Sequence, residues 1–259
     1  MNMFSAMGAL LCGAIVVYAV WIEPYWIEVT HHRISAPLSS PLKLVHLSDI
    51  HARDVGRRER RLVEILRAEK PDIIVITGDT VIRGYTPEGL SRVLEQFDAP
   101  LGIWFVFGNW EHWEGAPMNP SFYEAAGVRL LLNRGQLVRG DVWLAGFDDL
   151  SAGRPNMQAA LNGRPADVFT IALFHSPAYF DQVAGQCHLA LAGHTHGGQV
   201  RLPLLPPLWL PPGCGPYAEG WYERNGSRLY VSRGVGTAVV NVRFFCRPEV
   251  AVITIGPTP

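Results

Sequence analysis

The sequence predicts an α/β fold in which two packed, mixed β-sheets are flanked by helices. Apolar, β-branched runs of strand length recur along the chain, and helical patterns separate the first three of them. Near the C-terminus, strand patterns follow one another with little helix between them, which indicates a second sheet packed on the first. Polar side chains directly follow five of the apolar runs, and this regularity suggests a shared site.

The N-terminal segment predicts a membrane anchor. Met3–Ile22 is a run of twenty residues without a charge, long enough for a helix that crosses the roughly 30 Å hydrocarbon layer. A cleaved signal peptide is the alternative, but no Lys or Arg precedes the run and the small-residue cleavage pattern is poor. The nearest basic residues, Arg33 and Lys43, follow the run. We predict a single-pass anchor with its interfacial segment at 1–26, and a body at 27–259 on the cytoplasmic side of the cell membrane.

The body alternates strand and helix patterns. WIEVTHHRI is typical of an edge strand, and the core strand patterns are LKLVHL, DIIVIT, GIWFVF, VFTIALF and HLALA. The helical patterns are RRERRLVEILRAEK and TPEGLSRVLEQF, of which the second opens on a Thr-Pro cap and first-turn pair. We assign VWLAGF, RLYVSR and EVAVITI to the second sheet. This alternation is the basis for the α/β assignment.

Composition excludes some partners and one structural class. The 22 basic residues nearly balance the 23 acidic ones, so a formal net charge of -1 gives no field that attracts a nucleic-acid backbone. We therefore expect no nucleic-acid partner. Cys12 lies in the apolar run, and Cys187, Cys214 and Cys246 are widely scattered, so the sequence contains no disulfide framework.

The side chains after the five core strands are of types that bind metals. They are Asp49 and His51, Asp79, Asn109, His175, and the pair His194 and His196. In open α/β sheets, ligands bind outside the carboxyl ends of the strands, so we expect these side chains to converge. Imidazoles mixed with carboxylate and amide oxygens suit Mn, Fe or Zn better than Ca or Mg. The glycines before Asp79, Asn109 and His194 let the backbone turn sharply.

These ordered motifs resemble those of the calcineurin-like metallophosphoesterases, from about Leu42 to Ile255. The resemblance implies a four-layer αββα sandwich, with 27–259 as its catalytic domain and two divalent metal ions as cofactors. It also implies the ligands of each metal: Asp49, His51 and His196 for one, Asn109, His175 and His194 for the other, with Asp79 bridging both. Two such cations, roughly 3.5 to 4 Å apart, activate water and stabilise both reacting oxygens of an in-line displacement at phosphorus.

Within that superfamily, the phrases LSDIHAR, GHTHGGQVRLP and LYVSRGVGT are similar to a membrane-associated branch that acts on lipid-linked or lipid A precursor phosphates. The resemblance implies a phosphodiesterase or pyrophosphatase whose partner is a membrane lipid, such as a lipid-linked phosphate or a UDP-2,3-diacylglucosamine-type precursor. Two alternatives stay open. One is a tethered phosphodiesterase with a soluble substrate, and the other is a metal-binding scaffold without turnover.

One position departs from the family pattern. The family's usual phrase is Gly-Asn-His followed by an acidic residue, and its His is thought to protonate the leaving group or contact the phosphate. Here Trp110 stands at that place, and an indole cannot supply the proton. Glu111 and His112 are adjacent substitutes. We predict His112 as the candidate catalytic acid, and a plain loop role stays open for it.

Other candidates lie outside the motifs. They are the acidic pair Asp148–Asp149, three arginines with the donors for a phosphate clamp (Arg53, Arg233 and Arg243), and two histidines in strand patterns, His46 and His188, which we expect to be packed and not ligands. The loop 201–213, with the phrase LPLLPPLWLPP, is too rich in proline for a spanning helix and too apolar for an ordinary exposed turn. It either contacts lipid or folds onto the core.

Overall fold

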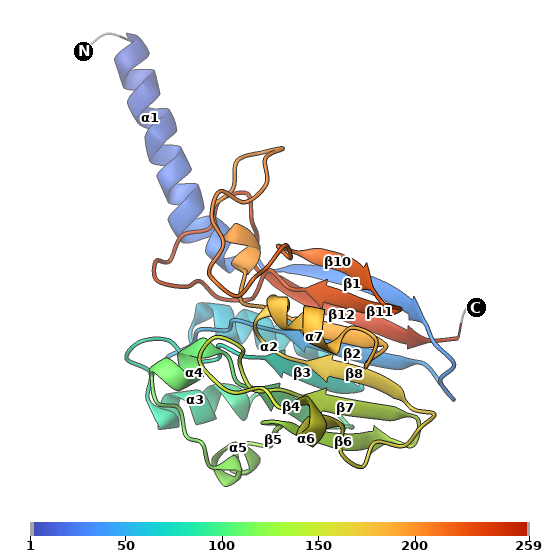
Figure 1. The fold of residues 1–259 in the computed structure, drawn as a ribbon. Coiled ribbons are helices and arrows are strands. Elements are labelled where there is room, and N and C mark those ends of the chain that lie inside the picture. Colours follow the sequence, from blue (N-terminus) through green and yellow to red (C-terminus); the bar gives the residue numbers. More distant parts are fainter. Residues whose placement is uncertain (1–2, 258–259) are drawn as a thin grey trace.

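Two six-stranded sheets form the body of the protein in the computed structural model, which describes residues 3–257 (Figure 1). The first sheet contains, in spatial order, β1 (Glu28–Ser35), β12 (Glu249–Gly256), β2 (Leu42–Leu47), β3 (Ile73–Thr77), β4 (Ile103–Val106) and β5 (Val128–Leu130). The second contains β10 (Gly220–Arg224), β11 (Ser227–Val231), β9 (Leu189–Ala192), β8 (Phe169–Leu173), β7 (Val142–Gly146) and β6 (Arg134–Arg139). Each sheet has both parallel and antiparallel pairs, as predicted.

Helices cover the outer face of each sheet. On the first sheet, α2 (Arg57–Glu69), α3 (Pro87–Leu94) and α5 (Pro120–Ala125) pack their apolar side chains against the strands. On the second sheet, α6 (Met157–Leu161) and α7 (Phe180–Val183) do the same. The shorter segments α4 (Asn109–Trp113), η3 (Pro177–Tyr179) and η4 (His196–Gly198) lie at strand ends. The four predicted layers are therefore present.

The alternation of side chains along a strand explains how one run serves two interfaces. In β2, Leu42 and Leu44 point into the core between the sheets, while Val45 and Leu47 point toward the helices. All four side chains are fully buried. A strand covered on both faces therefore reads as a continuous apolar run.

The C-terminal strand corrects one prediction. We assigned EVAVITI to the second sheet, but β12 lies in the first, parallel to β1 and antiparallel to β2. Conversely, β8 and β9 belong to the second sheet, so the five strands that lead to the site come from both sheets. The apolar runs of doubly covered strands carry no information about which partner they pair with. The sequence patterns also missed the short strands β5, β6 and β10.

The N-terminal helix stands off the body (Figure 1). It runs as α1 (Met3–Val17), a π-helical segment η1 (Tyr18–Ile22) and a 3₁₀ turn η2 (Glu23–Tyr25). One segment, Met7–Tyr25, is long and apolar enough to cross a membrane. The end of this helical segment is tied to the body, because the buried Glu23 carboxylate accepts hydrogen bonds from the backbone N–H groups of Phe245 and Cys246. The division at residue 26 stays a prediction.

The core between the sheets predicts a large effect for one substitution. Leu44→Ala deletes a fully buried side chain of β2, so it should lower the free energy of unfolding by about 2–5 kcal/mol. Leu137 of β6 is 38% exposed and offers a matched control, for which Leu137→Ala should change stability by roughly 0.5 kcal/mol or less. Urea unfolding of the detergent-solubilised chain measures both, and equal losses would contradict this core.

Candidate metal centre

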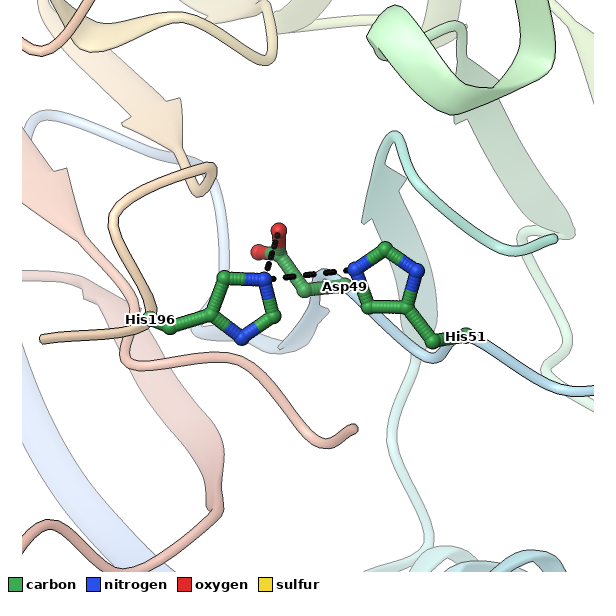
Figure 2. Close-up of side chains that lie close together, drawn as sticks. All are labelled: Asp49, His51 and His196. Carbon is green, nitrogen blue, oxygen red and sulfur yellow. Dashed lines mark hydrogen bonds and ion pairs between the residues drawn. The ribbon is translucent and has the colours of Figure 1, made fainter. Parts of the chain in front are cut away.

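Three of the predicted ligands form one buried group (Figure 2). Asp49 and His51 follow β2, and His196 opens η4 after β9. The Nε2 atom of His196 lies 3.3 Å from Oδ1 of Asp49 and 3.2 Å from Nε2 of His51. The donor atoms of these three residues all lie within 4.8 Å of one another, a spacing that can hold a metal ion.

A second group of three lies beside the first. Asp79 follows β3, His175 follows β8 and His194 follows β9. The Nε2 atom of His175 is 3.1 Å from Oδ2 of Asp79 and 3.0 Å from Nδ1 of His194. Loops from the two sheets therefore meet at one point, as the strand-end argument predicts.

Asp79 and Asn109 complete the set. Oδ2 of Asp79 lies 3.1 Å from the His175 ring and 3.7 Å from the His51 ring, so this carboxylate reaches both groups. Asn109, the first residue of α4, lines the same cavity as Asp79 and His194. Its Oδ1 atom is buried and has no hydrogen-bond partner among residues 3–257. All seven predicted ligands thus lie together.

Backbone carbonyls orient three of the four imidazoles. Outer ring nitrogens of His51, His175 and His194 hydrogen bond to carbonyl oxygens at 3.0, 2.7 and 2.8 Å, respectively. A carbonyl only accepts, so each outer nitrogen carries the hydrogen and each inner nitrogen is left to bind a proton or a metal ion. Inner nitrogens face each other at 3.0–3.2 Å, so each pair needs a shared proton or a metal ion to avoid the repulsion of two lone pairs. The carbonyls belong to Val81, Thr77 and Pro212.

Burial shifts the titration of several groups in the site. It raises the pKa of Asp79 to about 7 and lowers the pKa of His51 to about 4. It also lowers the pKa of His194 and of His196, so these rings are neutral near pH 7, which is the form that binds metal. Against the effect of burial, the Asp79 carboxylate raises the pKa of His175. Divalent cations would supply the positive charge that keeps the buried carboxylates ionised and would replace the proton on this ring. The residues therefore fit a dinuclear metal site.

The backbone at the site is strained. Five of the seven predicted ligands have a positive φ of 47–71°, in the left-handed region that non-glycine residues rarely adopt. Each such conformation costs roughly 1–3 kcal/mol, and a cluster of them is typical of functional sites. The five residues are Asp49, His51, Asp79, His194 and His196.

Glycines are required at the site for two different reasons. Gly78 has φ +86°, so the sharp turn before Asp79 needs the conformational freedom of glycine, as predicted. Gly108 and Gly193 have no such φ, and the turn argument is wrong for them. A Cβ on Gly108 would lie 2.3 Å from Oδ1 of Asp79, and one on Gly193 would lie 1.8 Å from the Ser48 hydroxyl. These two glycines provide space.

Glu111 is a supporting residue whose role the sequence did not indicate. Its buried carboxylate accepts backbone N–H groups of Asp79 at 2.8 Å, Thr80 at 2.6 Å and Gly108 at 2.7 Å. It therefore fastens the loop after β3 to the start of α4. Because all three partners donate, the carboxylate acts as an acceptor, which does not suit a proton donor. In the sequence, the only signal for this residue was its acidic type at the position after Trp110.

His112 and Trp110 occupy different surroundings. Nε2 of His112 lies 2.7 Å from Oδ1 of Asp148, and the ring is not among those that line the cavity. Its catalytic role stays a prediction. Trp110 lines the cavity, its backbone N–H donates to Oδ1 of Asp79 at 2.9 Å, and its ring meets that of His51 edge to face at 5.3 Å.

Two arginines considered as phosphate clamps are engaged elsewhere. Arg243 is fully buried and donates to backbone carbonyls, including those of Gly236 and Cys246. Arg233 forms ion pairs with Glu28 at 2.8 Å and Glu249 at 3.5 Å. Both guanidinium groups thus hold the segment that leads from β11 to β12.

Three further polar residues are also accounted for. Asp149 accepts a hydrogen bond from the Ser176 hydroxyl at 2.6 Å, next to His175. His46 hydrogen bonds to the Thr77 hydroxyl at 2.7 Å, and His188 accepts from a backbone N–H at 2.9 Å. Both histidines lie outside the two groups.

A cavity of about 650 Å³ opens above the two groups. Asp79, Asn109, His194 and His196 form its polar part. The remaining wall is largely apolar, with Trp110, Trp113, Leu208, Trp209, Val239 and Val240 among its residues. A phosphate group and an apolar group therefore both find matching surroundings in one cavity.

The two sheets and the paired groups are those of a protein with a dinuclear-metal-like site, and sequence comparison specifies its family. A profile of the family described as "Calcineurin-like phosphoesterase" matches residues 42–198. The chain is also 33% identical to the metallophosphoesterase YkuE of Bacillus subtilis, over 99% of this chain and 96% of that one. The chain belongs to the calcineurin-like phosphoesterases, and it is a metal-dependent phosphoester hydrolase.

Two further relatives have informative names. The phosphodiesterase YaeI of Escherichia coli is 29% identical, over 92% of each chain. A Danio rerio protein named "Transmembrane protein with metallophosphoesterase domain" is 31% identical, over 88% of this chain and 56% of that one. The predicted family and enzyme class are confirmed.

The position of Asp79 between the groups predicts the effect of neutralising it. Asp79→Asn should reduce bound metal from two ions toward one or none and should abolish turnover, because a neutral amide bridges two cations poorly. Asp98→Asn, at an exposed position, is the matched control and should keep both metals. Elemental analysis of the pure proteins gives the metal content directly. Two metals and normal turnover in Asp79→Asn would show that Asp79 does not bridge.

Proposed function

We propose that this chain hydrolyses a phosphoester or pyrophosphate bond in a membrane-associated substrate, such as a lipid-linked phosphate or a UDP-diacylglucosamine-type lipid precursor. The cavity carries this proposal, because metal-binding residues lie in its polar part while its walls are largely apolar. A substrate with a phosphate at one end and an apolar part at the other matches this division. The relative named a phosphodiesterase supports the bond class.

The metal ligands follow from the two groups. Asp49, His51 and His196 would hold one cation, and Asn109, His175 and His194 the other, with Asp79 bridging. The donor set favours Mn, Fe or Zn. When bound, two such cations activate water as the nucleophile and stabilise the reacting oxygens of an in-line displacement at phosphorus.

The protein's own residues hold this arrangement in place. The carbonyls of Thr77, Val81 and Pro212 fix which ring nitrogens face inward, and Glu111 fixes the loop of Asp79. The Trp110 ring packs edge to face against the buried His51 ring. No protein nucleophile is needed, because water attacks the phosphorus.

We place the protein at the cell membrane. The segment Met7–Tyr25 serves as a single-pass anchor, in keeping with its length and hydropathy and with the relative named as transmembrane. The body lies on the cytoplasmic side, since the first basic residues follow the anchor. The partner is a membrane lipid and not a nucleic acid, in keeping with the balanced charge.

Paired substrates test the proposed substrate class. The full chain in detergent micelles, loaded with Mn, is assayed on a diacylated pyrophosphate lipid and on the same head group without acyl chains. Since the apolar wall binds only the lipid, kcat/KM should be at least about tenfold higher for it, equivalent to about 1.4 kcal/mol. Equal values would indicate a tethered enzyme with a soluble substrate. No turnover on either substrate with two metals bound would indicate a scaffold.

Trp110 predicts which bonds are cleaved well. Without an acid at this position, an alkoxide leaves slowly, whereas a phosphate, with a second pKa of about 6, leaves unprotonated near pH 7. Trp110→His should therefore speed cleavage of alkyl phosphoesters much more than cleavage of pyrophosphates, by up to the ~10²–10⁴-fold that general acids supply. The measurement is kcat/KM for phosphodiesters graded by leaving-group pKa. If wild-type rates did not depend on that pKa, His112 would be the better candidate for the acid.

A further inference from the structure

Two loops expose large apolar side chains that the core does not use. The first follows η4 and covers 200–213, and the second covers 237–245; we call them the apolar loops. In the first, Leu204 is fully exposed and Trp209 is 69% exposed. In the second, Val239 is 85% exposed and Phe245 is 53% exposed. Contiguous exposed apolar surface of this kind marks a site of contact with a protein, a ligand or a membrane.

The backbone conformation presents these side chains outward at a cost. Leu204, Val239 and Phe245 have φ values of 67°, 59° and 51°, where a residue with a Cβ is disfavoured. The β-branched Val239 is the most unusual of the three. All three side chains are exposed, so burial within the chain offsets little of the free-energy cost of this backbone conformation. Contact with a partner outside the chain would offset this free-energy cost.

The second apolar loop packs directly on the end of the N-terminal helical segment. The backbone N–H of Arg243 donates to the Ala19 carbonyl at 2.9 Å, and the side-chain amide of Asn241 donates to the Tyr25 hydroxyl at 3.3 Å. In Figure 1, the loop after η4 projects to the side of the body on which α1 stands. A bilayer that contains the helical segment therefore has its surface at the level of these loops.

Arginines surround the same junction. The Arg57 guanidinium lies 4.8 Å from the centre of the Tyr25 ring, and that of Arg247 lies 4.2 Å from the centre of the Trp26 ring. Within the described part of the chain, Arg57 makes no ion pair. It also lines a hollow with Tyr25 and Val239, so basic and apolar side chains adjoin. Aromatic and basic residues together are typical of the level of lipid head groups.

We propose that this face of the body rests on an anionic lipid bilayer, as a second contact besides the anchor. The apolar loops insert into the boundary between head groups and acyl chains, about 5–10 Å deep, and the arginines lie at the phosphates. Leu208, Trp209 and Val239 also line the cavity above the metal-binding groups. The mouth of the cavity thus opens at the lipid surface, and a lipid reaches it without crossing water. The inference rests on the proposed membrane location and not on the identity of the substrate.

Fluorescence quenching in the full chain tests the contact. The chain is reconstituted in vesicles of anionic phosphatidylglycerol and neutral phosphatidylcholine that carry a quencher high on the acyl chain. A fluorophore is attached to one cysteine in each of three proteins. The first is the wild type, labelled at the exposed Cys12. The other two are Leu204→Cys and Leu137→Cys, each combined with Cys12→Ser. The other three cysteines are buried. Leu137 is 38% exposed and belongs to β6, a strand that lies far from α1 in Figure 1, so it is the matched control.

The expected result is quenching at Cys12 and at Leu204→Cys, several-fold stronger than at Leu137→Cys. Quenching at Cys12 alone would overturn the proposal, because the anchor would be inserted while the loops stay in water. No quenching at any position would overturn the membrane location as well. Since no substrate is present, these outcomes are independent of turnover, and a contact can fail while lipid hydrolysis persists.

A second measurement compares quenching in anionic and in neutral vesicles. In purely neutral vesicles, quenching at Leu204→Cys should fall. Arg57→Gln should cause a smaller fall in anionic vesicles, because it removes the attraction of one basic residue and not of all of them. Arg61 also lies on α2 but pairs with Glu64, so Arg61→Gln is the matched control. Metal content reports that every variant is folded. Identical quenching with and without anionic lipid would overturn the electrostatic part of the contact.

Discussion

Six titratable side chains meet in a space from which water is largely excluded, and each needs a partner for its charge or lone pair. Strand ends from both sheets bring them there, and carbonyls of neighbouring loops turn the imidazoles inward. Five of these residues have strained backbones, which together cost several kcal/mol. Only a rigid support makes such a site possible, and the core between the sheets provides it, with Leu44, Leu144 and Leu173 fully buried between them.

The sequence predicted the strands and ligands well because both are local signals. An apolar run such as LKLVHL predicts a strand by itself, and a polar side chain directly after the run can only lie at the end of that strand. Pairing is not local, which is why β12 was assigned to the wrong sheet. The acidic residue after Trp110 drew attention to Glu111, but its role depends mainly on the backbone N–H groups of Asp79 and Thr80, which are 31–32 residues away in the chain and which no local pattern indicates.

Trp110 connects the chemistry of the site with the nature of its cavity. Its backbone N–H still donates to Asp79, as the fold requires at the start of α4, but its side chain adds an indole to the wall. The position therefore contributes apolar surface in place of a titratable ring. Together with Trp113 and Trp209, it gives the wall of the cavity an aromatic surface beside the polar metal-binding residues. The metal-binding residues and the apolar wall thus occupy adjacent parts of a single cavity.

The buried carboxylate of Glu23 has a mechanical consequence. It joins the last turn of the N-terminal helical segment to the backbone of Phe245 and Cys246, and Arg243 of the same loop donates to the carbonyl of Ala19. Such a junction transmits rotation, because it leaves no flexible linker between helix and body. Helices adapt to bilayers of different thickness by tilting. If the helix crosses a bilayer as we propose, a change in bilayer thickness that tilts it would rotate the whole body, and with it the direction in which the cavity faces.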